Sequence, residues 1–408
     1  MDEQELREAI RRLRVPDEEK ARRRSLELVR QAAAERQPPR RRLPRLARHA
    51  TAALLALLAA IGLAFSPAGA KVAELIDADG VGKPADTLDR IPGGGRILAE
   101  TFRGAWIVNS DGSKRRLGDY DEVSFSAPLA ANVAAADNRS LSAVGVDGEV
   151  RWSIVAPDRV RDPRWSPNGF RVAYRGGTEL RLVNGDGTGD RALDRRATGA
   201  PAWRPLDPER PAEPQALAYP APDRRVVAIE PATGRELWET GAGRPAREID
   251  WPTRDRVVIT RAREIEVRSG GDGRERAALT PLGDAFIVDS DAAPDGRRIA
   301  YVTSTGKNSQ LWLARVNDRG QTRQRRVLTA PGAVGFSSVS FSPDGSRLLL
   351  AWQGLDQWLF INPDPSRKQL GGLISFGDLS EQFTSGGRSA EQVGSVGVSG
   401  WAPELPED

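Results

Sequence analysis

The chain has 408 residues, more than one ordinary domain needs, and carries a formal net charge of +4. It contains no cysteine and a single histidine, His49, which excludes disulfides, thiolate chemistry, cysteine-based metal sites and a Ser-His-Asp triad. Residues 1–49 hold 15 Lys/Arg and 9 Asp/Glu, a net of +6, which leaves a net of −2 for the remainder. A nucleic-acid-binding domain needs a basic surface of its own, so we expect no nucleic-acid partner.

Residues 1–49 form a basic segment with helical periodicity. Leu6, Ile10 and Leu13 fall at helical spacing, and Pro16 opens a second helical stretch. We expect a short helical segment in the cytoplasm. Two interpretations stay open: a docking element, or a solvated tail that only helps to set the topology.

Residues 50–70 contain no charged side chain. At about 1.5 Å per residue a helix of this length spans a bilayer core of roughly 30 Å, so the segment predicts a single transmembrane helix. A buried core helix would normally keep one polar face. An acid-free cluster of arginines precedes the span: Arg40, Arg41, Arg42, Arg45 and Arg48. Such clusters resist translocation, which places the N-terminus in the cytoplasm and the C-terminal part outside it.

A cleaved signal peptide is the alternative to a membrane anchor. Ala68-Gly69-Ala70 fits the small-x-small cleavage pattern, and cleavage near Ala70 would release a secreted protein. The preceding region is far longer than the start of a usual signal peptide and contains acids. The sequence therefore favours an uncleaved single-pass anchor, followed by a linker over residues 71–95.

A repeated unit begins after the linker. Residues 164–174 read RWSPNGFRVAY, residues 340–350 read SFSPDGSRLLL, and a third copy over residues 293–301 lacks the aromatic residue. In each copy Pro-Asp-Gly or Pro-Asn-Gly supplies a tight turn, and a strand of alternating apolar residues follows. Further short strands complete the unit. Four strands in about forty residues are typical of one propeller blade.

Weaker copies extend the repeat over residues 96–403 at the spacing that blades require. Six aromatic residues are predicted as structural anchors at the ends of the inner strands: Phe125, Trp165, Trp203, Trp251, Phe341 and Trp401. With the copy that lacks its aromatic, the anchors predict an all-β propeller of seven blades, with six as the alternative. Residues 96–118 supply only three strands, so we expect residues 396–401 to complete that blade and close the ring. Residues 404–408 form a tail.

These repeats resemble the WD40-like propellers of the TolB type, most closely at residues 165–174 and 341–350. The resemblance implies a bacterial exported protein that binds proteins or peptides. A membrane anchor departs from secreted TolB, so its role in outer-membrane translocation does not transfer. Residues 231–238 are similar to one turn of quinoprotein propellers, but a single copy does not imply the quinone, and we expect no cofactor.

Two loops are the candidate ligand sites. Residues 184–190 carry oxygen ligands at alternate positions but lack the closing glutamate of a calcium loop, so we interpret them as a hairpin turn and expect no metal. The other loop offers two tryptophans with polar neighbours that could hold a peptide or glycan: Trp352, Gln353, Asp356, Gln357 and Trp358. The alternative is that both tryptophans pack between blades.

No catalytic motif is present in the sequence. A Gly-x-Ser-x-Gly elbow and sialidase-type boxes are both missing. We therefore expect no enzyme, but a monomeric, membrane-anchored propeller outside the cytoplasm that binds or scaffolds an envelope protein, peptide or glycan. The alternative is a glycosidase-like hydrolase that uses paired carboxylates.

Overall fold

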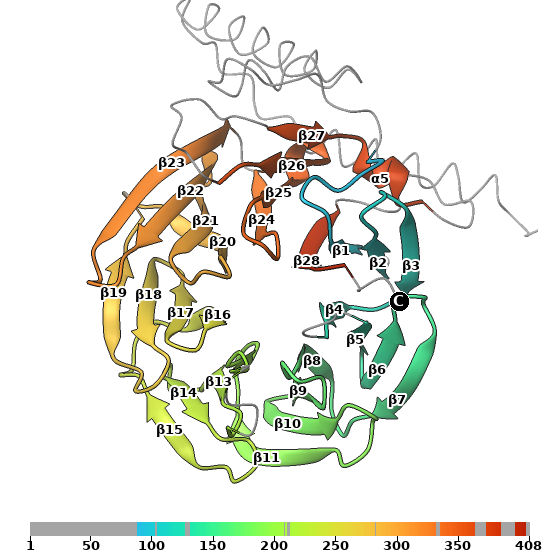
Figure 1. Cartoon of the computed structure of the whole chain (residues 1–408), viewed down its shortest axis with the longest axis vertical. Coiled ribbons are helices and arrows are strands. Elements are labelled where there is room, and N and C mark those ends of the chain that lie inside the picture. Colours follow the sequence, from blue (N-terminus) through green and yellow to red (C-terminus); the bar gives the residue numbers. More distant parts are fainter. Residues whose placement is uncertain are drawn as a thin grey trace, which may run out of the picture. The chain divides into compact units, whose positions relative to one another are not determined.

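The structure is a computed structural model that describes residues 88–102, 104–126, 131–207, 209, 213–281, 283–331, 335–363, 373–384 and 396–404. These residues form seven four-stranded antiparallel sheets arranged as a ring (Figure 1). The prediction of an all-β propeller with seven blades is confirmed, and the alternative of six is wrong.

Each blade has two inner strands. The innermost strands lie nearest the centre of the ring: β4 (Glu122–Phe125), β8 (Val160–Trp165), β12 (Ala202–Trp203), β16 (Ala246–Thr253), β20 (Phe286–Ala292), β24 (Phe336–Phe341) and β28 (Gly397–Ala402). The second strands lie next to them: β1 (Arg96–Thr101), β5 (Asn132–Asp137), β9 (Arg171–Gly176), β13 (Leu217–Pro220), β17 (Arg256–Arg261), β21 (Arg298–Ser304) and β25 (Leu348–Trp352).

Two more strands complete each blade towards the outside. The third strands are β2 (Gly104–Val108), β6 (Ser140–Gly145), β10 (Glu179–Asn184), β14 (Val226–Ile229), β18 (Glu264–Ser269), β22 (Asn308–Val316) and β26 (Gln357–Ile361). The outermost strands are β3 (Lys114–Gly118), β7 (Val150–Val155), β11 (Arg191–Arg196), β15 (Glu236–Glu239), β19 (Glu275–Leu279), β23 (Thr322–Pro331) and β27 (Ile374–Phe376). Two short helices accompany the blade of β24, namely η1 (Gln353–Leu355) and α5 (Leu379–Gln382).

The ring closes through strand β28, as the sequence predicts. This strand pairs antiparallel with β1, with Ile97 opposite Trp401. The Trp401 indole Nε1 donates a hydrogen bond to the Gly94 carbonyl oxygen at 2.9 Å. The first and last parts of the propeller therefore share one sheet, and β1 has no open inner edge.

The end of the expected linker packs against the propeller. Leu88 and Ile91 are buried in an apolar cluster with Trp106 and Trp358. Among the described residues no helix is long and apolar enough to cross a membrane. The helical segment predicted over residues 1–49 and the transmembrane helix predicted over residues 50–70 lie outside the described residues.

The repeated turn has the geometry that its sequence predicts. In the copy after β8, the Asn168 Oδ1 accepts a hydrogen bond from the Ser166 hydroxyl at 2.7 Å. Gly169 follows with φ of 73°, a left-handed conformation that glycine adopts without strain. Each such turn fixes where the second strand of its blade starts.

Apolar side chains fill the spaces between adjacent blades. The six aromatic anchors lie at or near the ends of inner strands, and five of these side chains are buried: Trp165, Trp203, Trp251, Phe341 and Trp401. Phe125 is half-buried and packs against the cluster around Leu98. Each blade thus packs on both of its faces against a neighbouring blade.

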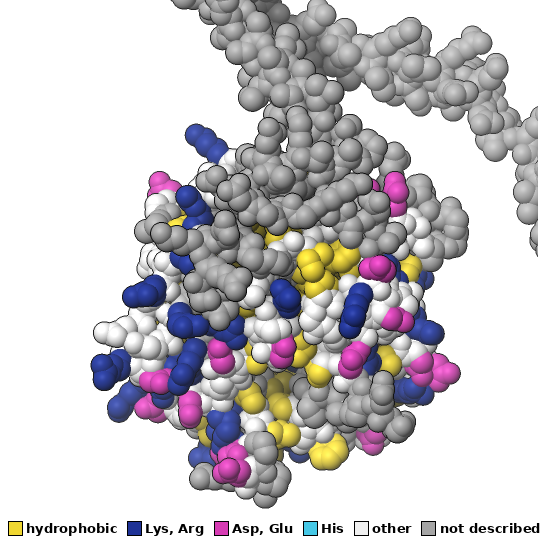
Figure 2. Space-filling view, turned by 45° about the horizontal axis from the view of Figure 1, so that its top comes forward, with side chains coloured by type: hydrophobic (Ala, Val, Ile, Leu, Met, Phe, Trp, Pro, Cys, Tyr) yellow, Lys and Arg dark blue, Asp and Glu magenta, His cyan; other side chains and the backbone are white. Residues whose placement is uncertain are grey.

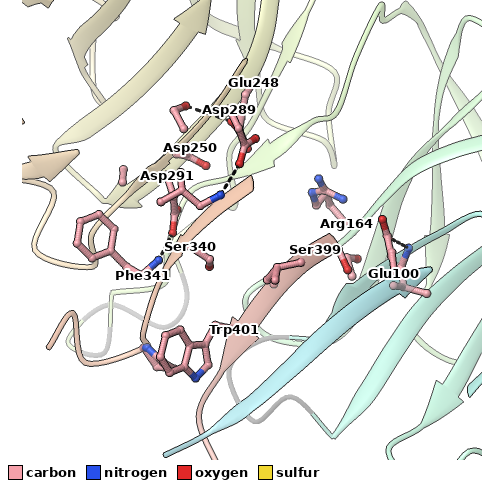
Figure 3. Close-up of a pocket in the computed structure, with 18 of the residues that line it drawn as sticks. Glu100, Arg164, Glu248, Asp250, Asp289, Asp291, Ser340, Phe341, Ser399 and Trp401 are labelled. Carbon is pink, nitrogen blue, oxygen red and sulfur yellow. Dashed lines mark hydrogen bonds between the residues drawn. The ribbon is translucent and has the colours of Figure 1, made fainter. Parts of the chain in front are cut away.

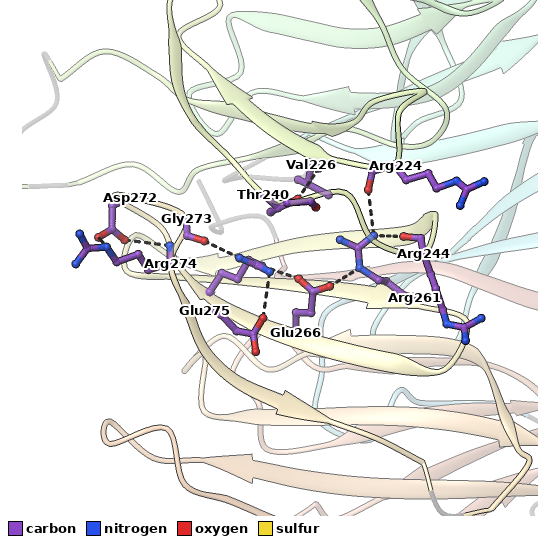
Figure 4. A network of polar contacts seen from close by, with 12 residues as sticks. Arg224, Val226, Thr240, Arg244, Arg261, Glu266, Asp272, Gly273, Arg274 and Glu275 are labelled. Carbon is purple, nitrogen blue, oxygen red and sulfur yellow. Dashed lines mark hydrogen bonds and ion pairs between the residues drawn. The ribbon is translucent and has the colours of Figure 1, made fainter.

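A buried ion pair lies in the blade of β16–β19 (Figure 4). Arg261 on β17 is 1% exposed, and its guanidinium pairs with the Glu266 carboxylate on β18. Arg261 also donates to the carbonyl oxygens of Arg224 and Arg244. Arg268 forms a second ion pair with the Glu266 carboxylate at 2.6 Å. Both carboxylate oxygens of Glu266 are therefore satisfied, and the network ties this blade to the turn at Arg224 in the preceding one.

Candidate functional site: an acidic central channel

A cavity of about 590 Å³ lies in the centre of the ring, and we call it the channel. Its charged lining consists of one arginine and seven carboxyl groups, namely Arg164, Glu100, Glu122, Asp162, Glu248, Asp250, Asp289 and Asp291. Basic and acidic side chains are interspersed over the described part of the face in Figure 2. The channel wall therefore differs from that face in carrying a strong excess of one charge.

Four of these carboxyl groups come from two neighbouring inner strands. Glu248 and Asp250 lie two residues apart on β16, and Asp289 and Asp291 lie two residues apart on β20. Alternate residues of a strand share a face, so each strand turns both of its acids in one direction. Figure 3 shows the four side chains grouped together, with Arg164 between this group and Glu100.

Backbone amides of β24 hold two of the four acids. The Val339 N–H donates to Asp289 Oδ2 at 2.8 Å, and the Phe341 N–H donates to Asp291 Oδ2 at 2.5 Å. These bonds stabilise the ionised form of each carboxyl group and fix its orientation. The acids thereby join two blades while remaining part of the cavity wall.

The acids on β16 have fewer partners. Glu248 accepts one hydrogen bond from the Ser290 hydroxyl at 3.1 Å, and that hydroxyl also bonds with Thr260. Asp250 Oδ2 is buried and has no hydrogen-bond partner among the described residues. A buried carboxyl oxygen without a donor destabilises the ionised form.

Burial raises the pKa of all four carboxyl groups. For Asp291 burial raises the pKa to about 7, against the hydrogen bond from Phe341. Burial, and then the negative charge of Glu248, raises the pKa of Asp250 and of Asp289 well above the usual value. Burial also raises the pKa of Glu248, while the nearby Arg164 lowers it. Burial therefore disfavours the ionised form of these four carboxyl groups.

The acids do not converge as ligands of a metal ion. Among the described residues no group of three or more His, Cys, Asp or Glu side chains has the geometry to hold one. The carboxyl groups are instead distributed along the wall, on strands of five blades. Such a distribution suits an extended organic cation more than a single inorganic ion.

The predicted ligand loop lies between β25 and β26, as expected, but its tryptophans belong to the strands. Trp352 is 3% exposed and packs edge-to-face on Phe336, and Trp358 is fully buried. The Trp358 indole donates to the Val396 carbonyl oxygen at 3.2 Å. This is the packing that the alternative interpretation describes. Ligand binding at this loop stays a prediction, and it would depend on the polar residues Gln353, Asp356 and Gln357 rather than on the two rings.

The loop over residues 184–190 is a hairpin turn. The Asn184 N–H donates to the Thr188 carbonyl oxygen at 2.9 Å, and Asp186 Oδ1 accepts from the Thr188 N–H at 2.9 Å. The aspartate that resembled a calcium ligand thus closes the turn.

The sequence interpretation missed the four channel acids, although it contained a signal for them. Glu248-x-Asp250 ends directly before the anchor Trp251, and Asp289-x-Asp291 ends shortly before the repeated turn at Pro294. The anchor marks the end of an inner strand, so acids at alternate positions before it belong to the strand that borders the channel.

Comparison with known proteins gives the fold class. No family model matches the chain, and no curated protein is similar to it in sequence. Among solved structures, Kluyveromyces lactis Hsv2 is similar at 11% identity with a TM-score of 0.51, over 72% of this chain and 96% of that one. Hsv2 of Kluyveromyces marxianus gives 13% identity and a TM-score of 0.50, over 70% and 94%. The C-terminal WD40 domain of Sif2 gives 12% identity and a TM-score of 0.49, over 68% of this chain and 80% of that one.

These likenesses concern the fold alone. The described residues form a seven-bladed β-propeller, and their fold is similar to that of Hsv2. Such a fold is consistent with a protein-binding or scaffolding module, and it does not define a ligand.

Proposed function

We propose that this propeller is a protein-binding module whose central channel receives a cationic segment of its partner. The observation that carries the proposal is the acidity of the channel wall, which contains seven carboxyl groups and only one arginine, Arg164. Glu122 and Asp162 are paired with Arg161 and Arg175, which leaves five carboxyl groups near Arg164. Asp250 and Asp289 are desolvated, and neither forms an ion pair with a cation among the described residues. An ammonium or guanidinium group would supply that compensation and form charge-assisted hydrogen bonds with the carboxylates.

The size and the rest of the wall support a peptide segment. A cavity of about 590 Å³ lies within the usual range for ligand sites. Val339, Phe341 and Trp401 add apolar surface to the lining. A lysine or arginine side chain has an apolar stem and a charged end, so it matches a wall that offers both.

We place this module outside the cytoplasm of a bacterial cell, held by a single-pass anchor. Support comes from the sequence, in the uncharged residues 50–70 and the arginines before them. The resemblance to TolB-type propellers supports an exported location as well. Reporter fusions at residues 30 and 408 test the topology, because a reporter that works only in the cytoplasm should be inactive at residue 408. Blots for tags at both ends separate an anchor from a cleaved signal.

Cross-linking and pull-down from living cells test the binding function. We expect the wild-type protein to retain a partner that the double variant Asp250→Asn/Asp289→Asn loses. Asp284→Asn is the matched control, because the Asp284 side chain is fully exposed and does not line the channel. Equal recovery of the same partner by both variants would show that the channel is not the binding site.

A propeller hydrolase is the second candidate. The observation in its favour is Asp291, whose pKa is raised to about 7 by burial beside other carboxyl groups, as a general acid requires. Turnover of a glycan by the purified protein, abolished in Asp291→Asn, would establish this function. The absence of turnover across a glycan screen would leave the binding function.

A further inference from the structure

A second pocket, separate from the channel lining, lies where the blade of β8–β11 meets the blade of β12–β15. It has a volume of about 320 Å³, and its lining includes Phe170, Arg171, Pro214, Gln215 and Pro231. The first two residues belong to the repeated turn after β8 or directly follow it. The next two precede β13, and Pro231 lies in the turn between β14 and β15. None of these residues lines the acidic channel.

The pocket combines exposed apolar side chains with hydrogen-bond donors that have no acceptor among the described residues. Phe170 is 72% exposed, a large value for a phenylalanine, and two prolines extend the apolar surface beside it. Gln215 Nε2 is buried and has no partner among the described residues. The Arg171 guanidinium has no ion pair within the described part of the chain. A buried donor without an acceptor costs free energy, which a ligand with an acceptor group can recover.

The three copies of the turn show what is particular to this one. Where Phe170 stands here, the other copies carry Ser346 and Arg297. The arginine that corresponds to Arg171 in the third copy is Arg298, which pairs with Asp295 at 2.7 Å. This turn has the neutral Asn168 in place of that aspartate, so the charge of Arg171 is not compensated within the turn.

One carboxylate lies in the pocket, and it is already compensated. Glu230 accepts hydrogen bonds from the Arg235 guanidinium at 3.1 and 3.2 Å. No ion pair joins Glu230 to Arg171 among the described contacts, so the space between them remains available. The lining of the pocket thus contains an uncompensated cation, a buried amide donor without a partner among the described residues, and apolar side chains.

We propose that this pocket binds the C-terminal residue of a peptide, with an apolar side chain on Phe170 and its carboxylate between Arg171 and Gln215. A carboxylate can accept charge-assisted hydrogen bonds from a guanidinium and an amide at the same time. The neutral carbonyl groups inside a peptide cannot form an ion pair with the guanidinium. The volume is at the low end for ligand sites and suits one residue rather than a large molecule. Capture of a terminal carboxylate is a known mode of peptide recognition.

The test uses the full-length protein and a fluorescein-labelled peptide that ends in Gly-Leu with a free carboxylate. Fluorescence anisotropy should show saturable binding, and the same peptide with a C-terminal amide should bind about tenfold or more weakly. The variants Arg171→Gln and Gln215→Leu should each lower the affinity for the free-acid peptide. They should also reduce the ratio of its affinity to that of the amide peptide. Phe170→Ser should weaken both peptides.

Arg347→Gln is the control, because Arg347 occupies the same position of the turn beside Ser346 rather than a phenylalanine. It should bind like the wild type, and a thermal melt of each variant verifies folding. Equal affinity for the acid and the amide would overturn the proposal. So would equal loss of binding in Arg347→Gln. If isocaproate, a free acid with the same side chain, competes as well as the peptide, the site takes small acids and the assignment to chain ends is wrong.

Discussion

One blade, β16–β19, buries charge in two contrasting ways. On β17 and β18 the buried Arg261 and Glu266 satisfy each other, and Arg268 and backbone carbonyls complete the network. On β16 the carboxyl groups of Glu248 and Asp250 belong to half-buried residues of the channel wall, and the cation near them is Arg164. The first arrangement holds the blade together. The second leaves carboxyl groups with raised pKa values and no ion pair on a cavity wall, which is the pattern that functional sites show.

The largest expected effect comes from breaking the compensated pair. Glu266→Ala leaves the Arg261 charge buried without its partner, so the free energy of unfolding should fall by about 3–5 kcal/mol. Glu275→Ala is the control, since Glu275 is exposed and, among the described residues, forms an ion pair with Arg268 alone, so it should change stability by less than about 1 kcal/mol. Denaturant unfolding measures both. Similar small losses in the two variants would mean that the buried network adds little.

The pH dependence of stability separates the two regions further. The channel acids have raised pKa values, with Asp291 at about 7, so between about pH 4 and pH 7 the folded protein binds more protons than the unfolded chain. Stability from these groups is therefore fully present below about pH 4 and is lost as the pH rises towards 7. We expect the free energy of unfolding to fall by a few kcal/mol over this range, and Asp291→Asn to reduce the fall. A stability that rises over the same range in the wild type and the variant alike would contradict this assignment.

Neutralising one channel acid should raise the free energy of unfolding, which is a smaller effect than the loss in Glu266→Ala and opposite in sign. Asp250→Asn removes a charge that burial disfavours and keeps the shape of the side chain. At about pH 8 the variant should be more stable than the wild type by about 1–2 kcal/mol, because the wild-type carboxyl group lacks a partner for Oδ2. Glu266→Gln, the same kind of change in the compensated pair, should be destabilising. If both substitutions destabilise equally, the distinction between the two regions fails.

The sequence predicts the scaffold better than the site, for a physical reason. Aromatic-Pro-Asn-Gly turns are local, since Asn168 and Gly169 determine the turn by their own hydrogen bonds and φ values. Residues 396–401 could be assigned to the first blade because three strands there lack an inner neighbour, and β28 confirms this pairing. Both inferences need only backbone chemistry and the count of strands.

The site depends on which way each side chain points once the ring has closed. Glu248-x-Asp250 alternates in the same way on an exposed strand as on a strand that borders a channel, so its pattern does not reveal burial. Trp352 and Trp358 show the converse. They look like loop residues in the sequence, but the strands β25 and β26 extend as far as Trp352 and Gln357, and both rings enter the core. Tertiary packing decides these positions.

Titration of the channel with a cationic peptide tests the central claim most directly. A labelled peptide with several lysines and an otherwise identical one with glutamines are compared by anisotropy at about pH 5.5 and about pH 8. Binding of a cation requires ionised carboxylates, so we expect the lysine peptide to bind more tightly at the higher pH, and Asp250→Asn/Asp289→Asn to weaken it about tenfold or more. The glutamine peptide should not bind. Affinity that is independent of pH and unchanged in the double variant would contradict a cation-binding role for the channel.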